Sequence, residues 1–327
     1  MPAGEADKAS DLKERIEAFV DEMKKGNAIN SCDIAISTIN LLIRIISQAK
    51  FTSARELLKH VKAEGKYLQA GDPSENIIGN MIRRVLKIIR EEYRAIIAQE
   101  AGGETLKFDD ASLSVDEDED YATPTPNLKA SVIEAISELK TEIEGGVENI
   151  AAMAPNYIHE NDIILTIGRS RTVESFFKSA ALKKIKFQVL VSECAPFCHG
   201  HEMAKNLAEA RINTTLITEC QLGTIMPRVN KVIIGTHSFM ANGGLKAVTG
   251  TNILALLAKE HNKDVIVCSN LYKLSPLFHS TMKHASFNKF ASPNELLDYE
   301  DAELLSKVEV IAPIFDYVPP DLISMVV

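Results

Sequence analysis

Apolar residues recur at helical spacing through the first hundred residues of the chain. An apolar residue at every third or fourth position places these side chains on one face of a helix. Ser10, Ser53 and the Pro73-Ser74 pair precede three of the stripes, and such residues commonly begin helices. The pattern predicts an all-helical domain over residues 1–100, with apolar stripes at 12–23, 34–46, 57–61 and 77–93.

The helical pattern stops at residue 101. Residues 115–121 are mostly acidic, and a Thr-Pro-Thr-Pro segment follows them. Because such a composition buries too little apolar area to offset its ordering entropy, residues 101–125 are predicted to be an acidic disordered loop. An acidic docking segment is the alternative interpretation. Apolar spacing resumes after Pro126 and predicts a long connecting helix over 126–157.

Beyond residue 158, short and uninterrupted apolar runs alternate with helical segments. Runs rich in β-branched residues are typical of buried parallel strands, and the spacing leaves room for a crossover helix between neighbours. We therefore expect an α/β fold over 158–327, with a doubly wound, mostly parallel Rossmann-like sheet behind the helical domain. The expected strands lie at 163–167, 187–191, 215–217, 231–234, 265–267 and 308–311.

Composition narrows the class of protein. A formal charge of -9 argues against binding along a phosphate backbone. Five scattered cysteines, an odd count, indicate reduced thiols. The polar N-terminus does not resemble a secretory signal, and no apolar run reaches the length of a membrane span. The sequence predicts a cytosolic protein without direct nucleic-acid or membrane contact.

The candidate chemistry lies in the loops after the strands, because ligands of doubly wound sheets bind at the carboxyl ends of their strands. The first predicted strand is followed by Gly168, Arg169, Ser170 and Arg171. Two arginines at a helix start could hold an anion. The segment is neither a dinucleotide fingerprint nor a P-loop. The favoured interpretation is therefore a turn with solvated arginines. Ser170 or Thr172 can cap the helix that follows it.

The second loop concentrates cysteine and histidine. Cys194 and Cys198 have a spacing that zinc sites allow, and His199 and His201 follow them. Adjacent Cys198 and His199 are hard to aim at one ion. A Cys–His nucleophile would need a third, orienting residue, and none is visible. We therefore expect no metal and no catalysis here, only small buried cysteines and ordinary histidines at a helix start.

Two further segments carry candidate residues. The Asn-Gly-Gly loop after the fourth strand demands positive φ angles and a close backbone approach, and a Thr-Gly-Thr segment after it can cap the next helix. An extended Phe-Asp-Tyr-Val segment before two prolines can line a cleft or an interface. The candidates are Asn242, Gly243, Thr249, Thr251, Asp316 and Tyr317.

A basic helix face stands out in the helical domain. Arg83, Lys87 and Arg90 recur at helical spacing, and Arg84 lies beside them. A solvated face with local pairs to glutamates 91 and 92 is one interpretation. A binding surface for an acidic partner is the other.

Taken together, these segments resemble the regulatory subunits of eukaryotic translation initiation factor 2B, and among them the beta-type subunits most. The matching stretches follow one another along nearly the whole chain, at 79–93, 165–174, 194–198, 200–204, 228–236, 241–243, 247–251, 273–276 and 315–320.

The resemblance implies a regulatory, non-catalytic subunit of a guanine-nucleotide exchange complex, without a cofactor. Its expected partners are the alpha, gamma, delta and epsilon subunits of initiation factor 2B. It also implies that the α/β domains build the regulatory core, while the helical domains face initiation factor 2 and help to sense phosphorylation of its alpha subunit. Positions 169–171, 194–201, 242–251 and 316–317 are then expected at subunit contacts or in a vestigial pocket.

The same superfamily contains sugar-phosphate isomerases, chiefly methylthioribose-1-phosphate isomerase. Their catalytic cysteine aligns with Gly168 and their catalytic aspartate with Gly244. Glycine supplies neither thiolate nor carboxylate, so proton transfer lacks its acid and base at these positions. A sugar-phosphate isomerase or binder remains the alternative function, since Asn242 and the backbone N–H groups near Gly243 could hold an anion. A dinucleotide-dependent oxidoreductase is disfavoured by the missing glycine fingerprint.

The chain departs from the family pattern at its end. The family usually continues with a glycine-containing turn and a last helix, whereas the sequence stops at Val327. The α/β domain is therefore expected to lack its last family segment.

Overall fold

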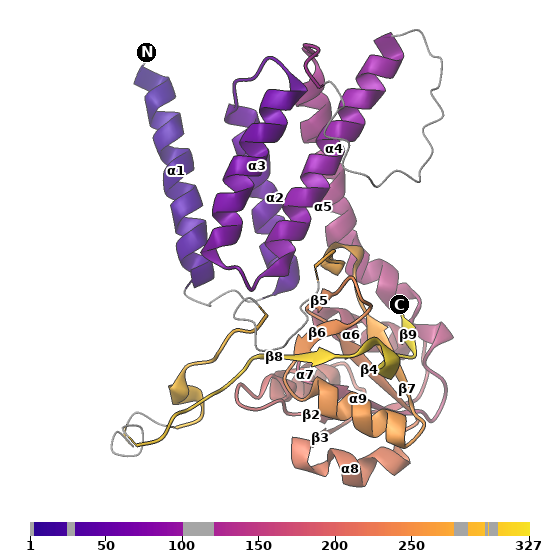
Figure 1. Cartoon of the computed structure of the whole chain (residues 1–327). Helices are drawn as coiled ribbons and strands as arrows, with labels where there is room; N and C mark the ends of the chain where they lie inside the picture. The colour runs from indigo at the N-terminus through magenta and orange to yellow at the C-terminus, as the bar shows by residue number, and fades with distance from the viewer. Residues whose placement is uncertain (1–2, 25–29, 101–120, 278–286, 298–299, 301–306) are drawn as a thin grey trace. The chain divides into compact units, whose positions relative to one another are not determined.

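The computed structural model divides the chain into two compact units, Met1–Glu144 and Gly145–Val327 (Figure 1). It describes residues 3–24, 30–100, 121–277, 287–297, 300 and 307–327. Most of the predicted acidic loop, residues 101–120, lies outside the described residues. The boundary at Gly145 falls inside the helix predicted to connect the two domains.

The first unit consists of helices, as the sequence predicted. Ser53 caps the third helix, because its side chain accepts a hydrogen bond from the Glu56 N–H at 3.4 Å. Ser10 is not an N-cap: the first helix begins at Ala3, and Ser10 lies within it among residues of good helix propensity. The helices are α1 (Ala3–Lys24), α2 (Ser31–Gln48), α3 (Ala54–Gly71), α4 (Asn76–Glu100) and α5 (Leu128–Ala152), the last of which continues into the second unit.

The apolar stripes of these helices form the core of the first unit. Gly65 of α3 lets the backbone approach α4, because a Cβ atom at this position would lie 2.8 Å from Ile82 Cγ2. Residues 121–125, the end of the predicted loop, pack against the helices: Tyr121 is buried, and its ring lies 5.3 Å from that of Tyr93. None of the helices that the structure describes combines the length and apolar character needed to cross a membrane.

The second unit is built on a six-stranded parallel sheet with the order β3-β2-β1-β4-β7-β9. This order places a switch point between β1 and β4 and confirms the doubly wound, Rossmann-like α/β fold. Two layers of helices cover the sheet: α6 and α7 pack with Phe176 and Met203 against one face, and α8 and α9 with Leu222 and Leu254 against the other. The strands are β1 (Ile163–Ile167), β2 (Gln188–Ser192), β3 (Asn213–Ile217), β4 (Lys231–Gly235), β7 (Asp264–Cys268) and β9 (Met325–Val326). The helices are α6 (Arg171–Leu182), α7 (His199–Glu209), α8 (Leu222–Ile225) and α9 (Thr251–Glu260).

The predicted sixth strand at 308–311 is wrong. Val308 and Ile311 are exposed there, and the sheet edge is taken by β9, which pairs with β7. A two-residue strand has no apolar run that could be detected in the sequence. A second, antiparallel sheet was also not expected: it joins β5 (Ser238–Phe239), β6 (Leu245–Val248) and β8 (Phe315–Val318) in the order β5-β6-β8.

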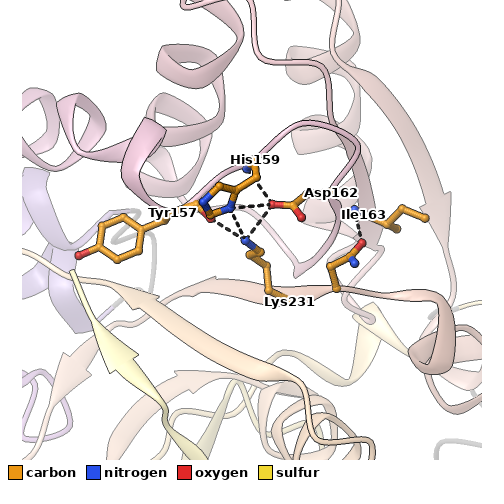
Figure 2. Close-up of polar contacts among 6 residues, drawn as sticks. Tyr157, His159, Asp162, Ile163 and Lys231 are labelled. Atoms are coloured by element: carbon orange, nitrogen blue, oxygen red, sulfur yellow. Dashed lines mark hydrogen bonds and ion pairs between the residues drawn. The ribbon is translucent and has the colours of Figure 1, made fainter.

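A polar cluster closes the amino ends of β1 and β4. Lys231 Nζ lies 2.8 Å from Asp162 Oδ2 and donates to the Tyr157 carbonyl at 2.7 Å, while the His159 N–H donates to the same Asp162 oxygen (Figure 2). The Ile163 N–H donates to the side chain of Asn230 at 2.8 Å. The ion pair between Lys231 and Asp162 is mostly buried. It joins the segment that precedes β1 to β4.

Candidate functional site

The carboxyl end of the sheet brings three loops together. Gly168 follows β1 with a φ of 59°, and a Cβ atom at this position would lie 3.3 Å from the Cys194 sulfur and 3.6 Å from a Val248 methyl. Cys194 in turn places its thiol 3.6 Å from the Thr249 carbonyl. The loops after β1, β2 and β6, which are separate in the sequence, therefore lie against one another at the carboxyl end of the sheet.

Asp316 of β8 organises the loop that begins α9. Its carboxylate accepts hydrogen bonds from the Gly250 N–H at 2.7 Å and the Asn252 N–H at 3.4 Å. Burial raises the pKa of Asp316, although these two hydrogen bonds act against the shift. The hydroxyls of Thr249 and Thr251 donate to the carbonyls of Pro313 and Val248, both at 2.6 Å. These predicted site residues thus hold the loop itself in shape.

Tyr317 occupies the space beside the Asn-Gly-Gly turn between β5 and β6. The Asn242 side chain donates to the Tyr317 hydroxyl at 2.8 Å and accepts from the Gly244 N–H at 3.0 Å, while Gly243 has a φ of 81°. A Cβ atom on Gly244 would lie 2.5 Å from Tyr317 Cε2. A larger side chain at position 244 has no room in this arrangement.

The two arginines after β1 lie differently. Arg169 forms an ion pair with Glu202 of α7 at 2.7 Å, and its Nε lies 3.6 Å from Glu174 of α6. Arg171 is the exposed first residue of α6. Ser170 caps α6 by accepting from the Val173 N–H, as the sequence allowed. Arg169 therefore joins two helices, with its side chain 30% exposed.

The cysteines and histidines of the second loop do not all point to one place. Burial raises the pKa of the Cys194 thiol to about 12, so this thiol is protonated at neutral pH and is not a nucleophile. His199 stacks on Phe197 with ring centroids 5.5 Å apart. His201 lies beside Glu193, with 3.4 Å between Nε2 and Oε2. Glu193 precedes the cysteines and belongs to no recognisable motif, so the sequence alone does not mark it as a site residue.

In the first unit, α4 carries the predicted basic face, but α5 supplies carboxylates to it. Arg84 pairs with Glu142 at 3.2 Å, and Lys87 pairs with Glu91 at 3.3 Å. Arg83 and Arg90 are half-buried on the same helix, and burial lowers the pKa of Arg83. A groove of about 420 Å³ runs along this surface, lined by Arg84, Lys87, Ile88, Glu91, Glu92, Ala135, Glu138, Leu139 and Glu142.

Four carboxylates and two cations line that groove, so its charge is mixed, with an acidic excess. Burial and the neighbouring Glu138, Glu91 and Glu134 carboxylates raise the pKa of Glu92. The sequence analysis missed the acidic side of the groove because α5 begins at Leu128, far along the chain from α4. The four-residue spacing of Glu134, Glu138 and Glu142 was the signal that could have revealed it.

Comparisons with known proteins extend the likeness over the whole chain. The sequence model of the Initiation factor 2 subunit family matches residues 28–327. The chain is 38% identical over 348 residues to Translation initiation factor eIF2B subunit beta of Dictyostelium discoideum, which covers 94% of this chain and 89% of that protein. Ribose 1,5-bisphosphate isomerase of Pyrococcus furiosus is 26% identical, over 86% of this chain and 78% of the isomerase.

The fold has a counterpart among solved structures. A chain in the crystal structure of the tetrameric eIF2B-beta2-delta2 complex from C. thermophilum superposes with a TM-score of 0.72 at 27% identity, over 100% of this chain and 93% of that chain. The fold class expected from the sequence and the resemblance to the regulatory subunits of initiation factor 2B are both confirmed. On these grounds the chain belongs to the Initiation factor 2 subunit family.

Proposed function

We propose that this chain is a beta-type regulatory subunit of the initiation factor 2B exchange complex and does not itself catalyse a reaction. The observation that carries the proposal is its similarity, over 94% of its length, to a relative named eIF2B subunit beta. Two glycines support it: by the motif alignment, Gly168 and Gly244 stand where an isomerase needs its thiol and carboxylate, and Tyr317 fills the space beside Gly244.

The partners that follow are the alpha, delta, gamma and epsilon subunits of the same factor, in the cytosol. The solved relative named for its beta2-delta2 assembly supports a delta-type partner in particular. Ile253 and Leu256 are 58% and 51% exposed on α9, and large apolar side chains of this kind on one helix face commonly mark an interface.

The test is to purify the chain with its candidate partner subunits and to determine the mass of the complex. A hetero-oligomer that contains the chain is the expected result. The purified chain should not turn over methylthioribose 1-phosphate or ribose 1,5-bisphosphate. A stable monomer with isomerase activity would contradict the proposal and establish the alternative function.

The helical unit is proposed to contact initiation factor 2 through the groove between α4 and α5, and so to help sense phosphorylation of its alpha subunit. The support is the exposed, charged lining contributed by Lys87, Glu91 and Glu142. Charged linings of this kind set partner orientation and association rate more than total affinity.

A further inference from the structure

Three different metal-ligating side chains meet in the loop between β2 and α7. Glu193 follows β2 directly, Cys198 is the N-cap of α7, and His201 lies in its first turn. One ligand atom from each of them lies within 4.8 Å of the other two. His201 Nε2 is 3.4 Å from Glu193 Oε2.

We propose that Glu193, Cys198 and His201 form a binding site for one zinc-class divalent metal ion at the carboxyl end of β2. Zinc takes thiolate sulfur, imidazole nitrogen and carboxylate oxygen at about 2.0–2.3 Å, commonly from three protein ligands with a fourth position left for water. The His201 side chain is 55% exposed, which leaves room for its ring to turn toward an ion.

The backbone already holds the three ligands in place. The Gly200 N–H donates to the Glu193 carbonyl at 2.9 Å, and the His201 N–H donates to the Cys198 carbonyl at 3.0 Å. Any Cβ atom on Gly200 would overlap the Ser192 carbonyl oxygen. Glycine therefore lets the first turn of α7 lie against the end of β2, which carries His201 to Glu193.

The electrostatics of the loop suit a cation. The Glu193 and Glu219 carboxylates lie near the Cys198 thiol. Glu219 is fixed close by, since it accepts a hydrogen bond from the Ala195 N–H at 3.0 Å. A divalent ion would offset the repulsion between the thiolate and these carboxylates, because coordination favours the deprotonated thiol.

The proposed ligands are not the neighbouring pair, Cys198 and His199, that the sequence draws attention to. Cys194 turns its thiol away, toward the Thr249 carbonyl, and His199 stacks on Phe197. The residue that joins Cys198 is His201, three positions later along the helix. The third ligand, Glu193, precedes both and carried no motif.

The test is a cobalt titration of the reduced, chelator-treated full chain. One equivalent of Co²⁺ should produce a thiolate-to-cobalt charge-transfer band, and Zn²⁺ should remove that band by displacing the cobalt. Cys198→Ser should abolish the band. His201→Gln and Glu193→Gln should weaken binding by more than about tenfold, the loss expected even for an outer-shell partner.

Two matched controls keep the result interpretable. Cys220→Ser changes an exposed cysteine outside the cluster, and His199→Gln changes the neighbouring histidine, so both should retain the band. Because the His201 ring is exposed, His201→Gln is expected to fold even where Cys198→Ser does not, and circular dichroism checks both. Absence of the band in the unaltered chain, or its persistence in Cys198→Ser and His201→Gln, would overturn the proposal.

Discussion

At the scale of single residues, Tyr317 decides which residue can stand at position 244. The tyrosine ring lies where the first side-chain atom of any residue at 244 would stand, and its hydroxyl is fixed by Asn242. The φ angle of Gly244 is not positive, in contrast to that of Gly243, so space and not backbone conformation requires glycine there. The packing thus requires glycine at position 244.

Gly244→Ala should therefore lower the free energy of unfolding by about 1–3 kcal/mol, the usual cost of overpacking. Gly145→Ala is the control: nothing lies within 4 Å of a Cβ atom there, so alanine in the interior of α5 should stabilise by about 0.5–1 kcal/mol. Urea unfolding measures both. In a Tyr317→Ala background the penalty at 244 should shrink; an equal penalty would show that the ring is not its cause.

At the scale of elements, α4 and α5 form a surface that neither helix shows alone. The cations come from α4, whereas Glu138 and Glu142 come from α5, and the Arg84–Glu142 pair joins the two helices. The side chains of this pair are 33% and 50% exposed, so it contributes little to stability. The Arg84–Glu142 pair matters instead for the pattern of charges that the surface presents to a binding partner.

Reversing the charges of Lys87 and Arg90 to glutamate should weaken binding of initiation factor 2 to the assembled complex. Loss of exposed charge pairs of this kind costs about 1 kcal/mol, or roughly fivefold in affinity. Surface plasmon resonance at two salt concentrations measures the effect, which should fade at high salt. Lys62→Glu, on the exposed face of α3, is the matched control. Unchanged binding in an intact complex would remove the groove from the proposed contact surface.

At the scale of the whole molecule, the second unit leaves large apolar side chains exposed. Ile253 and Leu256 lie three residues apart on α9 and share one face, while Leu254 and Ala255 of the same helix are buried. Covering this face would remove no polar side-chain group from water. The face is therefore a candidate for subunit contact.

The double variant Ile253→Asp, Leu256→Asp should release the chain from its hetero-oligomer, because charges placed in an apolar contact cost about 2 kcal/mol or more, roughly thirtyfold in affinity. Analytical ultracentrifugation of the co-purified subunits measures this. Leu182→Asp is the control, since that side chain is 84% exposed at the end of α6. Assembly that survives the α9 changes, or fails equally with Leu182→Asp, would place the contact elsewhere.

The sequence by itself determined the local and periodic features of this protein. Apolar stripes located the helices of the first unit, and β-branched runs located β1, β2, β3, β4 and β7, because period and burial are written into consecutive residues. That the two glycines at 168 and 244 replace the catalytic groups of an isomerase stays a prediction from the motifs. The weak edge strand β9 and the small sheet around β6 carried too few residues to be recognised.

Only the tertiary structure decided which distant residues meet. It joined Arg169 to Glu202, placed Tyr317 over Gly244, and set the α5 glutamates beside the α4 cations. It also separated Cys194 from Cys198 and brought Glu193 to His201. In the second unit these pairings depend on how α7 packs against β2 and on the crossover connections of the sheet, and in the first unit they depend on how α4 packs beside α5. No local sequence pattern encodes them.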